Sequence, residues 1–164
     1  MEALAAGTPA PAWTLKDRNG KSYVLAEALK QGPVLLAFFK VSCPVCQFTF
    51  PFIERIHQAV KDKNRLHIWG ISQDDARDTR DFAQEYGCTF PLLLDESDYA
   101  VSNQYGLTNV PTIFWVNPDG VIQVSSVGFD RKDIETIASE CGKLTGQPIA
   151  VFQPGDNVPN HTPG

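Results

Sequence analysis

The sequence has no long apolar run and no excess of basic residues. Its longest apolar run extends only from Val34 to Phe39, whereas a transmembrane helix needs about 20 apolar residues. The net charge of −5 argues against nucleic acid or an anionic membrane as a partner, because both attract basic surfaces. Residues 1–7 also lack the basic start and the apolar stretch of a signal peptide. We therefore expect a cytoplasmic protein, or a periplasmic or membrane-anchored one if an export signal has been trimmed from the chain.

Residues that could bind a metal are also sparse. Of the four cysteines, only Cys43 and Cys46 are close in sequence. A structural zinc site needs a second Cys or His pair at ligand spacing, and the three histidines are scattered at positions 57, 67 and 161. We therefore expect no metal and no cofactor. In a cytoplasmic chain, a single Cys-x-x-Cys motif indicates redox chemistry rather than a disulfide scaffold.

Length and composition indicate one soluble globular domain. The chain has 164 residues, of which 43% are hydrophobic and 20% are charged. It is long enough to bury a core without support from disulfides or a metal, and this composition is ordinary for a soluble protein. We expect a monomer with a single domain over residues 1–164 and its core at about 7–144. The tail over 145–164 is rich in Pro and Gly, and we expect it to wrap the surface or to be mobile.

Hydrophobic periodicity predicts strands that alternate with helices. A hairpin is expected at 13–25, because Asn19-Gly20 is a strong turn signal. Further strands are predicted at 34–39, 66–71, 90–94, 112–116 and 121–124. Helices are predicted from residue 46 onward with a kink at Pro51, at 74–86, at 99–105 and from 130 to 144. This order indicates an α/β sandwich with a mixed sheet.

The Cys43-Pro44-Val45-Cys46 motif lies where a buried strand ends and a helix begins. A cysteine at a helix N-terminus is stabilised as a thiolate by unpaired backbone amides and the helix dipole, and we expect Cys43 to be the attacking thiolate. Cys46, one turn into the helix, is expected to be more buried, to have a higher pKa and to resolve the mixed disulfide. Pro44 and Val45 are apolar and add no electrostatic help. Lys40 is either a charge that helps to stabilise the thiolate or a solvated lysine at a strand end.

Several segments resemble one known superfamily. Residues 38–46 (Phe-Phe-Lys-Val-Ser-Cys-Pro-Val-Cys) resemble the active-site strand and loop of thioredoxins, and Val110-Pro111-Thr112 resembles their cis-proline loop. Residues 7–13 and 17–21 look like the N-terminal hairpin of the redoxin branch, which contains the AhpC/TSA peroxiredoxins and TlpA-like thiol reductases. The resemblance extends over about residues 7–144. It implies a thioredoxin-like three-layer sandwich, with a mixed central sheet flanked by helices and an N-terminal hairpin extension.

The resemblance also implies a function. The chain is expected to be a thiol–disulfide oxidoreductase with an antioxidant role, which exchanges the Cys43–Cys46 dithiol with disulfides on other proteins and is recharged by an upstream electron donor. A reductase is favoured, because the cytosol keeps dithiols reduced. Pro111 is expected to be cis, which would place the backbone of Val110 beside the cysteines to pair with a substrate chain.

Two alternatives stay open, and departures from the family pattern count against efficient activity in the first of them. Ala37 stands where thioredoxin has a buried acid that assists the resolving thiol, and Lys40 stands where peroxiredoxins have a Thr or Ser that binds peroxide. The first alternative is a peroxiredoxin-like thiol peroxidase, in which Cys43 attacks peroxide and Cys46 resolves. The second is a non-catalytic binding module on the same fold.

Overall fold

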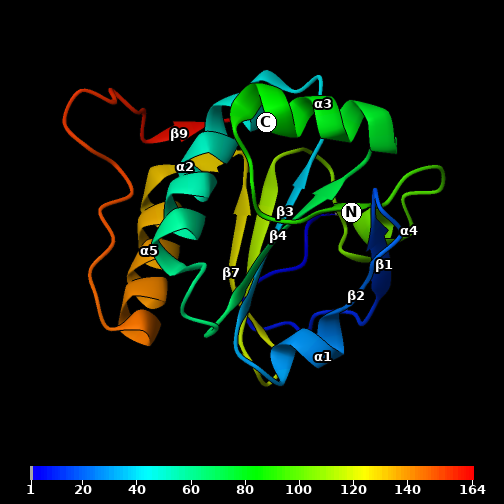
Figure 1. The fold of residues 1–164 in the computed structure, drawn as a ribbon, viewed down its shortest axis with the longest axis horizontal. Helices are drawn as coiled ribbons and strands as arrows, with labels where there is room; N and C mark the ends of the chain where they lie inside the picture. The colour runs from blue at the N-terminus through cyan, green and yellow to red at the C-terminus, as the bar shows by residue number, and fades with distance from the viewer. Residues whose placement is uncertain (1) are drawn as a thin grey trace.

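In the computed structural model, which describes residues 2–164, nine strands and five helices follow one another along the chain (Figure 1). The strands are β1 (Thr14–Asp17), β2 (Ser22–Val24), β3 (Val34–Phe39), β4 (His67–Ser72), β5 (Leu92–Leu94), β6 (Thr112–Val116), β7 (Ile122–Val127), β8 (Phe129–Asp130) and β9 (His161–Thr162). The helices are α1 (Leu25–Leu29), α2 (Pro44–Val60), α3 (Ala76–Tyr86), α4 (Ala100–Gln104) and α5 (Arg131–Thr145). Met1, the start of the expected domain, lies outside the described residues.

Seven strands form the central sheet in the order β2-β1-β5-β4-β3-β6-β7. β3 pairs in parallel with β4 and antiparallel with β6, so the sheet is mixed. All six residues of β3 are buried, because helices cover both faces of the sheet at this strand. β3 therefore lies in the middle of the sheet, and its carboxyl end is next to the start of β6.

The core has two parts, one on each face of the sheet. Helices α2, α3 and α5 cover one face, and Figure 1 shows α2 and α5 side by side there. Helices α1 and α4, with the N-terminal segment, cover the other face. Odd-numbered side chains of β3 point to the first face and even-numbered ones to the second, as the two-residue period of a strand requires. The expected three-layer thioredoxin-like sandwich, with its N-terminal hairpin, is confirmed.

Some element boundaries differ from those predicted. Helix α2 begins at Pro44 instead of residue 46, which makes Cys43 its N-cap. Leu144, the last residue of the helix predicted from 130 to 144, is 38% exposed. Gly142 lies at one edge of the buried face of α5. Because successive residues of a helix are rotated by about 100°, Leu144 lies at the opposite edge of that face. Helix α1 and strands β8 and β9 were not predicted, because they are too short to show a period.

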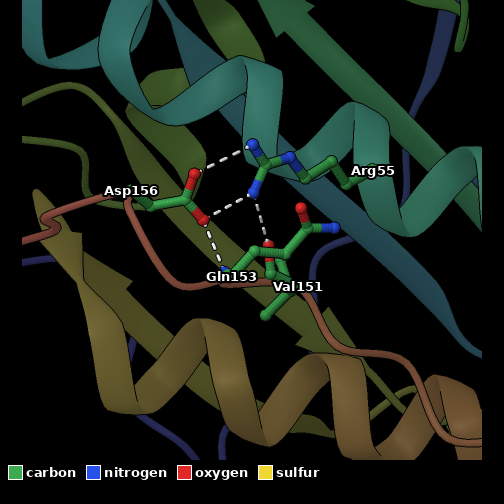
Figure 2. A network of polar contacts seen from close by, with 4 residues as sticks. All are labelled: Arg55, Val151, Gln153 and Asp156. Atoms are coloured by element: carbon green, nitrogen blue, oxygen red, sulfur yellow. Dashed lines mark hydrogen bonds and ion pairs between the residues drawn. The ribbon is translucent and has the colours of Figure 1, made fainter.

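The tail, residues 146–164, is fixed along the surface. Figure 1 shows it running from the end of α5 back toward the start of α2. On α2, the Arg55 guanidinium donates to both carboxylate oxygens of Asp156, at 2.8 and 3.1 Å, and to the Val151 carbonyl at 3.0 Å (Figure 2). Beyond this clamp, β9 pairs antiparallel with β8. Of the two expected arrangements, the tail therefore adopts the one in which it wraps the surface.

Candidate functional site

The candidate site begins where β3 ends and α2 starts. Pro44 occupies the first turn of α2, where its missing N–H costs nothing and its fixed φ suits a helix. Cys43 is the N-cap, with φ −83° and ψ 114°, so its side chain lies over the unpaired amides of the first turn. The local sequence thus places a sulfur atom where backbone donors point.

The Cys43 sulfur is held between two elements. It accepts a hydrogen bond from the Cys46 N–H, with an N–S distance of 3.1 Å. On its other side, it lies 3.5 Å from the carbonyl oxygen of Val110, to which its thiol donates. The Cys43 side chain is half-buried and can be reached from solvent.

Cys46 lies one turn further along α2 and is completely buried. Burial, followed by a hydrogen bond with Cys43, raises the pKa of the Cys46 thiol well above its ordinary value. Both cysteines carry free thiols, so the structure represents the dithiol state. The Cys43 thiol is accessible and accepts a backbone hydrogen bond, whereas the Cys46 thiol is buried and protonated. Such a pair can pass from a mixed disulfide to an internal disulfide.

Two side chains outside the motif hold the loop before Cys43. The N–H of Val41 donates to the Asp74 carboxylate at 2.8 Å, and the amide of Gln47 donates to the Val41 carbonyl at 2.9 Å. Helix α3 is capped by Asp75, whose carboxylate accepts from the Asp78 N–H, whereas the neighbouring Asp74 binds the loop at Val41. No local signal distinguishes the two neighbouring aspartates, because the partner of Asp74 is 33 residues away.

The second wall of the site is the loop that leads into β6. The Val110–Pro111 peptide bond is cis, and Pro111 is buried. The hydroxyl of Thr112, the first residue of β6, donates to the Asn109 carbonyl at 2.7 Å. The Gly128 N–H donates to the Pro111 carbonyl, also at 2.7 Å. These bonds hold the Val110 carbonyl over the cysteine motif.

The remaining predicted site residues lie around this centre. Pro44 is exposed and Val45 is half-buried, so the two form an apolar rim beside Cys43. Lys40 is exposed at the end of β3, and its carbonyl accepts from the Cys43 N–H at 3.2 Å. Within residues 2–164, no ion pair involves the Lys40 ammonium, so its influence on the thiolate stays a prediction.

The other two cysteines are buried away from the motif. Burial raises the pKa of both Cys88 and Cys141 to about 12. Cys88 lies 8% exposed behind the end of α3, and Cys141 is fully enclosed on the inner face of α5. Both are packed as small apolar side chains.

Residues 2–164 contain no group of three or more His, Cys, Asp or Glu side chains arranged to hold a metal ion. In the same part of the chain, none of the helices combines the length and the apolar character needed to cross a membrane.

Known proteins with similar sequences and folds fit this geometry. A thiol–disulfide oxidoreductase ResA from Bacillus subtilis is 30% identical over 122 residues, which cover 74% of this chain and 66% of that protein. The thioredoxin domain of a thiol–disulfide oxidoreductase from Bacteroides vulgatus superposes with a TM-score of 0.72 at 27% identity, over 84% of this chain and 98% of that domain. A proposed protein disulfide isomerase from Bacteroides thetaiotaomicron gives a TM-score of 0.80 at 23% identity, over 90% of this chain and 96% of that one, and supports the fold alone.

The family assignment rests on a match to a family model. The model of the AhpC/TSA family matches residues 6–125, which include the Cys43–Cys46 motif and the loop at Pro111. Both walls of the site therefore lie inside the matched region. The chain belongs to the AhpC/TSA family, in the redoxin branch of the thioredoxin superfamily, and it is an oxidoreductase.

Proposed function

We propose that this protein reduces disulfides on other proteins, with Cys43 as the nucleophile and Cys46 as the resolving thiol. The observation that carries the proposal is the environment of the Cys43 sulfur, which caps α2 and accepts the Cys46 N–H at 3.1 Å. A backbone donor and the positive end of a helix both favour a negatively charged sulfur. Cys46 is fully buried and stays protonated until it is needed.

The proposed cycle has two exchange steps. The Cys43 thiolate attacks one sulfur of the substrate disulfide, which forms a mixed disulfide and releases the first substrate thiolate. Cys46 then loses its proton and attacks the Cys43 sulfur, which forms the internal disulfide and releases the second substrate thiolate. Two electrons pass from the protein to the substrate. An upstream dithiol donor returns them and restores Cys43 and Cys46.

Val110 and Pro111 are proposed to receive the substrate backbone. The Val110 carbonyl lies 3.5 Å from the Cys43 sulfur, so a chain paired with this loop would bring its disulfide to the nucleophile. Pro44 and Val45 would contact the apolar part of the same substrate. The proposed direction, reduction, follows from the predicted cytoplasmic location, because that compartment keeps dithiols reduced.

The test is the equilibrium redox potential of the Cys43–Cys46 pair against glutathione, with alkylation and mass mapping of all four thiols. A reversible couple confined to these two cysteines, near or below about −230 mV, would support a reductase, and one near about −120 mV an oxidant. A disulfide between Cys43 and Cys88 would refute the assignment of Cys46. Peroxide consumption coupled to thiol oxidation would favour the peroxidase alternative. Partner binding that survives Cys43→Ser unchanged, without any exchange activity, would favour the binding module.

A further inference from the structure

Residues 160–164 reach the candidate site from the far end of the chain. The Arg131 N–H donates to the Asn160 carbonyl at 2.9 Å, and β9 then pairs with β8. Figure 1 places the end of the chain near the start of α2. Upstream, the clamp between Arg55 and Asp156 fixes the middle of the tail to α2 (Figure 2). The tail is therefore attached on both sides of residue 158.

The end of the tail touches the loop at Pro111. The Asn109 side-chain amide donates to the Gly164 carbonyl at 3.4 Å. A methyl group added at Gly164 would lie 2.1 Å from the Val110 oxygen and 3.4 Å from the Pro111 nitrogen, so the backbone of Gly164 is packed directly against this peptide. The Cys43 thiol faces the same Val110 oxygen. The backbone of Gly164 and the Cys43 thiol therefore both lie against the Val110 carbonyl.

A second glycine makes room for this approach. Gly128 has φ +78°, a conformation that favours glycine, and a Cβ there would lie 2.5 Å from the Thr162 oxygen and 3.1 Å from the Gly164 nitrogen. Gly128 also donates to the Pro111 carbonyl. The tail end therefore packs, backbone against backbone, on two segments that border the site.

We propose that residues 162–164 determine which disulfides reach Cys43. The inference rests on the proposed function, in which a substrate chain pairs with the backbone of Val110. An extended chain needs the space beside the Val110 carbonyl to add itself as a strand, and Gly164 takes that space. A polypeptide disulfide has to displace the tail end, whereas a small-molecule disulfide reaches the sulfur without doing so.

The experiment compares two probes that release the same chromophore. One is free cysteine, and the other is an extended peptide with a central cysteine; both carry thionitrobenzoate as a mixed disulfide. Two variants remove the tail end from the loop: a chain shortened to residues 1–159, and Gly164→Ala in the full chain, whose Cβ would lie 2.1 Å from the Val110 oxygen. Gly146→Ala is the matched control, because it makes the same substitution at a glycine that has open space around its Cβ. Circular dichroism establishes that each variant is folded.

We expect both tail variants to react about fivefold faster with the peptide probe, since displacing contacts of this kind costs roughly one net hydrogen bond. Their rates with the cysteine probe, and both rates of Gly146→Ala, should equal those of the parent chain. An unchanged ratio between peptide and cysteine rates in the folded tail variants would overturn the inference. Failure of the proposed function looks different: Cys43→Ser would then react with the cysteine probe as fast as the parent chain.

Discussion

The resolving step should depend steeply on pH. Burial is the largest cause that raises the pKa of Cys46 above its ordinary value of 9.0, and we expect this burial to persist after Cys43 has entered a mixed disulfide. When the pH is two units or more below its pKa, a cysteine is at most about 1% thiolate. In that range the thiolate fraction rises about tenfold for each pH unit. Resolution by Cys46 should therefore accelerate about 100-fold between pH 7 and pH 9.

Stopped-flow mixing with dithiobis(nitrobenzoate), the disulfide of two thionitrobenzoate groups, measures this step directly. Attack by Cys43 releases the first thionitrobenzoate, and attack by Cys46 releases the second. The leaving group is ionised throughout this pH range, so the second phase reports the protonation of Cys46. A Cys88→Ala, Cys141→Ala background removes the other thiols, which are buried outside the motif.

Cys46→Ala in the same background is the control, and it should release one equivalent of thionitrobenzoate instead of two. The reasoning would be refuted by a second phase with the same rate at pH 7 and pH 9. It would equally be refuted by a second phase that persists in Cys46→Ala, because another group would then resolve the disulfide.

Three further outcomes concern stability. Gly70→Ala should lower the free energy of unfolding in urea by about 1–3 kcal/mol, because its Cβ would lie 2.5 Å from the Leu92 side chain in a packed core; no loss would mean that the core repacks. Unfolding free energy should fall as pH rises above 9, by about 1 kcal/mol at pH 10 for each of Cys88 and Cys141, because the unfolded chain loses their protons first; alanine at both positions should flatten the profile. Burial lowers the pKa of His57, so stability present above pH 6.5 should decline as pH falls below it, and His57→Leu should show less of this decline in thermal melts.

The redox motif could be predicted from local sequence because its physics is local. A continuous apolar run produces a central strand, and a proline after Cys43 starts the helix that follows. The spacing of Cys43 and Cys46 alone puts one sulfur at the helix end and the other one turn inside. The greater burial predicted for Cys46 agrees with the structure, and this burial raises the pKa of its thiol above the ordinary value.

The position of Val110 relative to Cys43 required more than local sequence. These residues are 67 positions apart, and they meet because β6 pairs with β3 in the sheet. The family resemblance indicated this contact. Hydrophobic periodicity could not, because it shows which face of an element is buried but not the order in which strands pair in a sheet. The role of Asp74, which holds the loop at Val41, was missed for the same reason.

The sequence by itself determined the strand–motif–helix unit, the two thiols with their different burial, and the α/β class, because each depends on interactions within a few turns of one element. Tertiary structure alone decided the course of the tail. Its Pro/Gly-rich composition has no period, so nothing local indicated that Asp156 would bind Arg55, or that Gly164 would lie against Val110. Those contacts exist because α2, α5 and the loop before β6 are brought to one end of the sheet, where the tail can bind all three.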